Sequence, residues 1–113
     1  MKLPSKIKIG GHNYKIRYPY IFDKDNLTGQ YCPETDEIKI KQITLSGAIQ
    51  SETSQILSFF HEILHAINGI YCMYNLGKEC NTEDLIDALS EGIYQVLIDN
   101  PELREIICVA EKN

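Results

Sequence analysis

The chain has 113 residues, of which 43% are hydrophobic and 24% are charged, a balance typical of one globular domain. Its formal net charge is −5 and its 11 basic residues are dispersed, so we do not expect the clustered basic face that nucleic acid requires. No apolar run approaches the roughly 20 residues of a membrane span, and the first residues lack the apolar stretch of a signal peptide. We therefore expect a single soluble, cytoplasmic domain over residues 1–113, with neither nucleic acid nor membrane as a partner.

The first third of the chain alternates apolar and polar residues, which is the pattern of half-buried strands. Two alternating runs, 7–9 and 13–18, flank Gly10-Gly11 and predict a hairpin. A short strand is expected at 29–32, and the clean alternation at 37–41 predicts another. Lysines on the outward side of this last strand favour a place at the edge of the sheet, where they discourage accidental pairing.

The remainder has apolar residues at helical spacing. The first predicted helix starts after Ser51, a plausible N-cap, and ends near Gly69. A second helix is expected from Asn81 or Thr82 to about Asp99, and a third from Pro101 to about 110. The predicted fold is therefore α+β, a small antiparallel sheet of about three strands followed by three helices.

The segment His61-Glu62-Ile63-Leu64-His65 has the pattern H-E-x-x-H and falls on the first predicted helix. Histidines four residues apart lie on one face with Cβ atoms roughly 5–6 Å apart, so both rings can reach one Zn²⁺. The intervening glutamate can then take a proton from a zinc-activated water. The motif predicts His61 and His65 as zinc ligands and Glu62 as the general base. The alternative, two ordinary partly buried histidines, is disfavoured by the helical and apolar surroundings.

A catalytic zinc site needs a third protein ligand. The only other histidine is His12 in the predicted hairpin, so we expect a carboxylate from the second half of the chain. The candidates are Glu79, just before the second predicted helix, and Glu83, Asp84, Asp87 and Glu91 within it. Glu91 is favoured because its helix is apolar nearly all round, which predicts a carboxylate shielded from water that a metal would stabilise. Asp87 is the second candidate, either as a ligand or as an acceptor that orients a zinc-bound histidine.

The segments H-E-I-L-H-A-I and, in the next predicted helix, D-A-L-S-E-G-I-Y resemble the minimal zincins of the ImmA/IrrE type and small phage-encoded metallopeptidases. The resemblance covers residues 29 to 101. It implies a gluzincin-like hydrolase with His61, His65 and Glu91 as zinc ligands, Glu62 as general base, and a protein or peptide substrate.

Three points stay open in the sequence. Tyr94, three residues after Glu91, is a candidate to stabilise the oxyanion, with core packing as the alternative; Tyr71 and Tyr74 are further candidates. The strand at 37–41 is a candidate to bind an extended peptide by strand addition. The alternatives to an enzyme are a zinc-stabilised binding module and an inactive metallopeptidase homologue that acts through protein–protein interaction.

The four cysteines contain no C-x-x-C pair. In a reducing compartment we expect them to be buried or partly buried small apolar side chains rather than disulfides. A second zinc site at Cys72 and Cys80 would have poor spacing.

Overall fold

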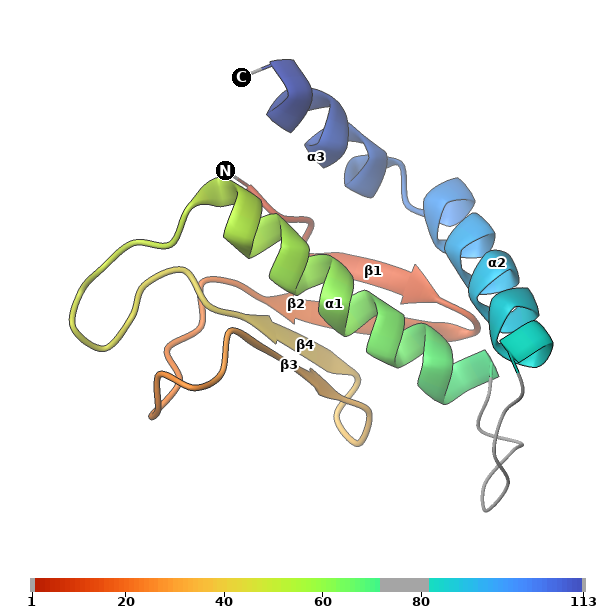
Figure 1. Ribbon diagram of the computed structural model, residues 1–113, viewed down its shortest axis with the longest axis horizontal. Helices are drawn as coiled ribbons and strands as arrows, with labels where there is room; N and C mark the ends of the chain where they lie inside the picture. Colours follow the sequence, from red (N-terminus) through yellow and green to blue (C-terminus); the bar gives the residue numbers. More distant parts are fainter. Residues whose placement is uncertain (1, 72–81, 113) are drawn as a thin grey trace.

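The computed structural model describes residues 2–71 and 82–112. Within them four strands precede three helices, which confirms the predicted α+β class. The elements are β1 (Lys6–Ile9), β2 (His12–Arg17), β3 (Gly29–Cys32), β4 (Glu37–Ile40), α1 (Glu52–Tyr71), α2 (Thr82–Asp99) and α3 (Pro101–Lys112). Helix α1 lies across one face of the sheet, while α2 and α3 follow one another along its side (Figure 1). No helix of this described part is long and apolar enough to cross a bilayer.

The β1–β2 hairpin forms where the alternation predicts it. Ile7 pairs with Tyr14 and Ile9 with His12, and the side chains of Ile7, Ile9 and Tyr14 are buried. Gly10 sits in the turn with a φ of 60°, a left-handed conformation that glycine adopts without steric cost.

The sheet is mixed, with strand order β1-β2-β4-β3, and this corrects the prediction of a purely antiparallel sheet. β4 runs parallel to β2, with Ile16 opposite Ile38, and pairs antiparallel with β3 on its other side. The side chains of Ile38 and Ile40 are fully buried, and pairing on both sides places β4 in the interior of the sheet. The predicted edge strand is therefore central, and β1 and β3 form the two edges of this four-stranded sheet.

The outward lysines of this segment led to the prediction of an edge strand. Hydropathy alone does not show that each of these lysines has a partner within the fold. Lys41 is only 2% exposed, and its Nζ lies 3.2 Å from a carboxylate oxygen of Asp25. The Nζ of Lys39 lies 4.7 Å from the centre of the Tyr20 ring, a cation–π contact. Each lysine thus has a partner, and neither needs a free strand edge beside it.

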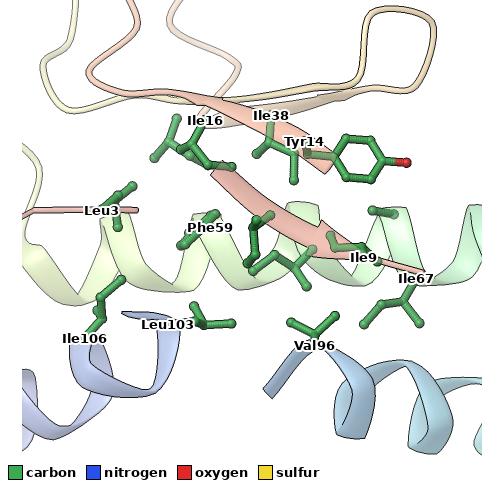
Figure 2. Close-up of a cluster of buried hydrophobic side chains, with 14 residues drawn as sticks. Leu3, Ile9, Tyr14, Ile16, Ile38, Phe59, Ile67, Val96, Leu103 and Ile106 are labelled. Atoms are coloured by element: carbon green, nitrogen blue, oxygen red, sulfur yellow. The ribbon is translucent and has the colours of Figure 1, made fainter. Parts of the chain in front are cut away.

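The hydrophobic core fills the space between the sheet and α1 and is closed by the other two helices. Figure 2 shows Ile9, Ile16 and Ile38 from the strands meeting Phe59 and Ile67 from α1. Val96 of α2 and the α3 residues Leu103 and Ile106 cover the far side of this cluster. Burial of this cluster holds α1 in place and so fixes the position of the H-E-x-x-H segment.

The two longest helices approach closely at Gly92. A Cβ atom at this position would lie 2.3 Å from Cγ2 of Ile67, well inside van der Waals contact. We expect Gly92→Ala to lower the free energy of unfolding by about 1–3 kcal/mol through overpacking, measured by urea denaturation. In the double variant Ile67→Ala/Gly92→Ala the losses should be less than additive, because the clashing methyl group is gone. Strict additivity would contradict this contact between α1 and α2.

Candidate metal centre and catalytic base

The two histidines of the motif lie together on the exposed side of α1. This helix starts as predicted, with the Ser51 hydroxyl accepting a hydrogen bond from the Ser54 backbone at 3.1 Å. The Nε2 atoms of His61 and His65 are 3.1 Å apart. Two nitrogen ligands of one tetrahedral zinc ion would be roughly 3.4 Å apart. The spacing therefore suits a shared metal ion, and equally a hydrogen bond between two neutral rings in the metal-free protein.

Glu62 belongs to the same helical turn as the histidines but lies on its buried side, next to them. Its side chain is 8% exposed, and its Oε2 is 4.0 Å from Nε2 of His61. Burial raises the pKa of this carboxyl, while the two histidines and a hydrogen bond from the Tyr31 backbone oppose that shift. Glu62 is thus desolvated beside the two imidazoles, as a general base in a water-poor site should be.

Strand β3 shapes the space around Glu62 through a glycine. A Cβ atom at Gly29 would lie 3.0 Å from Cγ and 3.1 Å from Oε2 of Glu62. The carboxylate therefore fits only because Gly29 has no side chain. Sequence reasoning missed this residue; the available signal was a glycine at the start of a strand, which often marks the close approach of another group.

The outer edge of β3 borders this site. The Lys41 N–H donates to the Thr28 carbonyl at 3.0 Å, so Thr28 and Lys41 form a hydrogen-bonded pair of the β3–β4 ladder. In an antiparallel ladder such pairs alternate with pairs whose backbone groups face outward. The backbone groups of Gly29 and Tyr31 therefore point away from β4, which agrees with the Tyr31 hydrogen bond to Glu62. The prediction that residues 37–41 accept a peptide by strand addition is wrong, since β4 is paired on both sides.

At the other edge of the sheet, side-chain amides form hydrogen bonds with the backbone of β1. Asn100 accepts from the Lys8 N–H at 2.8 Å and donates to the Lys8 carbonyl at 2.8 Å. Gln95 donates to the same carbonyl at 3.0 Å. Because these hydrogen bonds use the Lys8 backbone, an added strand cannot pair with this part of the β1 edge. At the opposite edge, no strand within residues 2–71 and 82–112 lies beyond β3.

A pocket of about 380 Å³ lies between the start of β3 and α1. Its lining consists of uncharged residues together with one histidine and the buried glutamate: Asn26, Leu27, Thr28, Gly29, Leu57, Ser58, His61 and Glu62. The pocket thus places an open, mostly uncharged surface next to the proposed metal ligand and base.

The acidic residues of α2 do not join the histidines in this structure. Glu91, Asp87, Glu83 and Asp84 are all exposed, and Glu79 lies outside the described residues. Across the described part of the chain, no three His, Cys, Asp or Glu side chains are placed to hold a metal ion together. The structure thus brings together two of the predicted ligands and the base, but not Glu91.

The expectation that Glu91 is shielded from water is wrong for a packing reason. Helix α2 buries the narrow face that carries Ala88, Gly92 and Val96, whereas Ile86 and Ile98 are 49% and 57% exposed. An apolar sequence all round a helix does not mean that neighbours cover it all round, and Glu91 lies outside the covered face.

None of the described tyrosine candidates for the oxyanion lies at the histidines. Tyr94 is 70% exposed, and it follows Gly92 by two residues, about 200° round the helix and so away from α1. Its alternative role in the core is therefore wrong. The Tyr71 hydroxyl donates to Gln95 at 3.3 Å, and Tyr74 lies outside the described residues.

The described cysteines, Cys32 and Cys108, are free thiols, as expected. Cys32 is partly buried as predicted, whereas the prediction of burial is wrong for Cys108, which is exposed on α3. Cys72 and Cys80, the pair considered for a second zinc site, lie outside the described residues.

We compared the chain with models of protein families, with curated proteins and with solved structures, and none of the three comparisons found a match.

Proposed function

We propose that the protein is a zinc-dependent metallopeptidase that hydrolyses peptide bonds in a protein or peptide substrate. One observation carries the proposal: the Nε2 atoms of His61 and His65 are 3.1 Å apart, with the carboxylate of Glu62 4.0 Å from the nearer ring. A metal, a nucleophilic water and a base need this juxtaposition. The resemblance of the H-E-I-L-H segment to minimal zincins supports the same function.

The chemistry divides between the metal and Glu62. A zinc ion held by His61 and His65 would lower the pKa of a water molecule toward about 7 and polarise the substrate carbonyl. Glu62 accepts the proton of the attacking water and then passes it to the leaving amine. The Tyr31 backbone and Gly29 hold the carboxylate in place beside the histidines. In the protein without metal, burial raises the pKa of the Glu62 carboxyl.

Chelation tests the dependence on metal directly. Removing metal with a chelator and dialysing the chelator away should abolish peptide cleavage, and added zinc should restore it. Cleavage that persists in protein shown by elemental analysis to be metal-free would contradict the proposal.

Glu91 remains our proposed third ligand, with Asp87 as the second candidate. The exposed position of Glu91 means that coordination would require the two helices to adjust around the metal. Glu91→Ala should weaken zinc binding by more than the roughly 10–100-fold typical of residues that only orient a ligand. Asp87→Ala should then cause the smaller loss, and Glu102→Ala, which removes an exposed carboxylate of α3, should cause none. Unchanged zinc affinity in Glu91→Ala would exclude this residue.

An extended peptide is the substrate form that the edge of β3 suits best. An added strand would form main-chain hydrogen bonds with the outward N–H and C=O of Gly29 and with the Tyr31 carbonyl, because the Tyr31 N–H already bonds to Glu62. This would place the peptide backbone next to Glu62, which already contacts both residues.

The second candidate function is a zinc-stabilised binding module. The outer side of α2 favours it, because Ile86, Tyr94 and Ile98 are 49%, 70% and 57% exposed, and exposed apolar side chains often mark a partner surface. The two functions differ in their response to Glu62→Gln: a binding module still binds its partner, whereas a peptidase no longer cleaves its substrate.

A further inference from the structure

We propose that the outer surface of α2 is a docking site for a basic amphipathic helix of a partner protein. This surface is defined by Ile86, Ile93, Tyr94 and Ile98, which are 49%, 42%, 70% and 57% exposed. The inference does not rest on the proposed peptidase activity, because none of these side chains belongs to the histidine site. It assigns a partner of defined chemistry to the exposed side of this helix.

The four side chains lie on the face of α2 that is turned away from α1. Gly92 marks the covered face, because a Cβ atom there would lie 2.3 Å from Cγ2 of Ile67. Successive residues of an α-helix are about 100° apart, so each of the four lies at least about 100° round the helix from Gly92. The surface extends over about three turns, or about 18 Å of helix.

The apolar side chains of this surface form a row along the helix. Ile86 and Ile93 are seven residues apart, and Tyr94 and Ile98 are four apart, so the members of each pair lie on one side of the helix. Single exposed apolar residues are common on soluble proteins, whereas a continuous group of them marks an interaction site. A row at helical spacing suits the apolar side of an amphipathic helix laid along it.

The charge of the two longest helices determines which kind of amphipathic helix fits. Neither α1 nor α2 contains lysine or arginine, whereas α2 contains five carboxylates: Glu83, Asp84, Asp87, Glu91 and Asp99. Four of them remain even if Glu91 binds a metal ion. Glu83 precedes Gly92 by nine residues and is exposed about 180° round the helix from it, on the docking surface itself. Lysine or arginine beside the apolar side of a partner helix would complement this charge.

The same charges disfavour other occupants. Pairing of α2 with α2 of a second copy would bring carboxylates together with no basic residue on either helix. The sheet of a second copy is basic on its outer face but offers no apolar side chain there from β1 or β2, whose outward residues are Lys6, Lys8, Asn13, Lys15 and Arg17. A bilayer with anionic lipids would repel the carboxylates.

Three synthetic peptides of about 18 residues, or about five helical turns, test the inference. The first has leucine on one side of the helix and lysine on the other. The second has glutamate in place of each lysine, and the third has the composition of the first in an order without an apolar side. Fluorescence anisotropy of the labelled peptides measures their binding to the wild-type protein. The first peptide should bind at least about 10-fold more tightly than either of the others.

Ile86→Ser/Ile98→Ser should weaken binding of the leucine–lysine peptide by about 10-fold, because two apolar contacts are lost. The matched control is Ile21→Ser/Ile49→Ser, which makes the same changes at positions outside the helices that are 79% and 72% exposed. This control should bind the peptide as tightly as the wild type. All four side chains are exposed, so both variants should keep the wild-type stability in a urea titration.

Glu83→Gln tests the charge of the surface separately. It should weaken binding of the leucine–lysine peptide by about 2–5-fold, the usual contribution of an exposed ion pair. Glu34→Gln makes the same change at an exposed position between β3 and β4 and should leave the affinity unchanged.

Equal binding of the three peptides, or an unchanged affinity in Ile86→Ser/Ile98→Ser, would overturn the inference. Sedimentation of the protein alone gives the remaining outcome: self-association of the wild type that is lost in this variant would assign the surface to a second copy and overturn it as well. None of these measurements depends on zinc or on peptide cleavage, so a failure here leaves the proposed function to its own tests.

Discussion

Glu62→Gln should lower peptide hydrolysis by the zinc-loaded protein by about 10²–10⁴-fold, the usual contribution of a general base. Glutamine keeps the shape of the side chain but cannot accept the proton of the attacking water. Neither predicted histidine ligand is altered, so the zinc content should stay at the wild-type value. The measurement pairs initial cleavage rates with elemental analysis of the same samples.

The matched control for this variant is Glu105→Gln, which makes the same chemical change on an exposed part of α3. It should cleave as fast as the wild type. Undiminished hydrolysis by Glu62→Gln would remove this residue from the mechanism. A loss of both zinc and activity would instead show that the buried carboxylate organises the metal site.

Phe59→Ala should lower the free energy of unfolding by about 3–5 kcal/mol. The ring is 0% exposed and sits in the core between the sheet and α1, where Figure 2 shows it facing the strand residues. Its removal leaves a cavity that the surrounding isoleucines cannot fill. A domain of this size has a free energy of unfolding of about 5–15 kcal/mol, so the expected loss is a large fraction of the total.

Leu57→Ala provides the comparison in the same urea titration. Leu57 lies two residues before Phe59 on α1 but is 63% exposed, so the expected loss is within about 0.5 kcal/mol. Similar losses in both variants would contradict the orientation of α1 on the sheet.

The sequence predicted the elements of the fold better than their arrangement. Alternation and helical spacing correctly located the β1–β2 hairpin, the start of α1 after Ser51 and the start of α3 at Pro101. A period of two residues shows which side of a strand is buried but not which strand lies next to it. The parallel pairing of β2 with β4 depends on how the β3–β4 hairpin packs, and that contact lies between segments distant in sequence.

The same distinction applies to the site. Helical spacing alone predicted that the rings of His61 and His65 meet, because both residues belong to one helix. The burial of Glu62 depends on Gly29 from another element, and no local pattern encodes that contact. Glu91 was misjudged because hydropathy shows how apolar α2 is but not which face the other elements cover. The zinc ion, the peptide substrate and the cytoplasmic location stay predictions from motif and composition.

The zinc content of protein purified without added metal is the decisive measurement for a metal site at His61 and His65. We expect close to one zinc ion per chain in the wild type and in His12→Ala, whose histidine lies in the β1–β2 hairpin and is 54% exposed. We expect almost none in His61→Ala and in His65→Ala, each of which keeps only one of the paired imidazoles. Wild-type protein that neither carries zinc nor binds it when zinc is added, or zinc that persists undiminished in both of these variants, would show that these histidines do not form a zinc site.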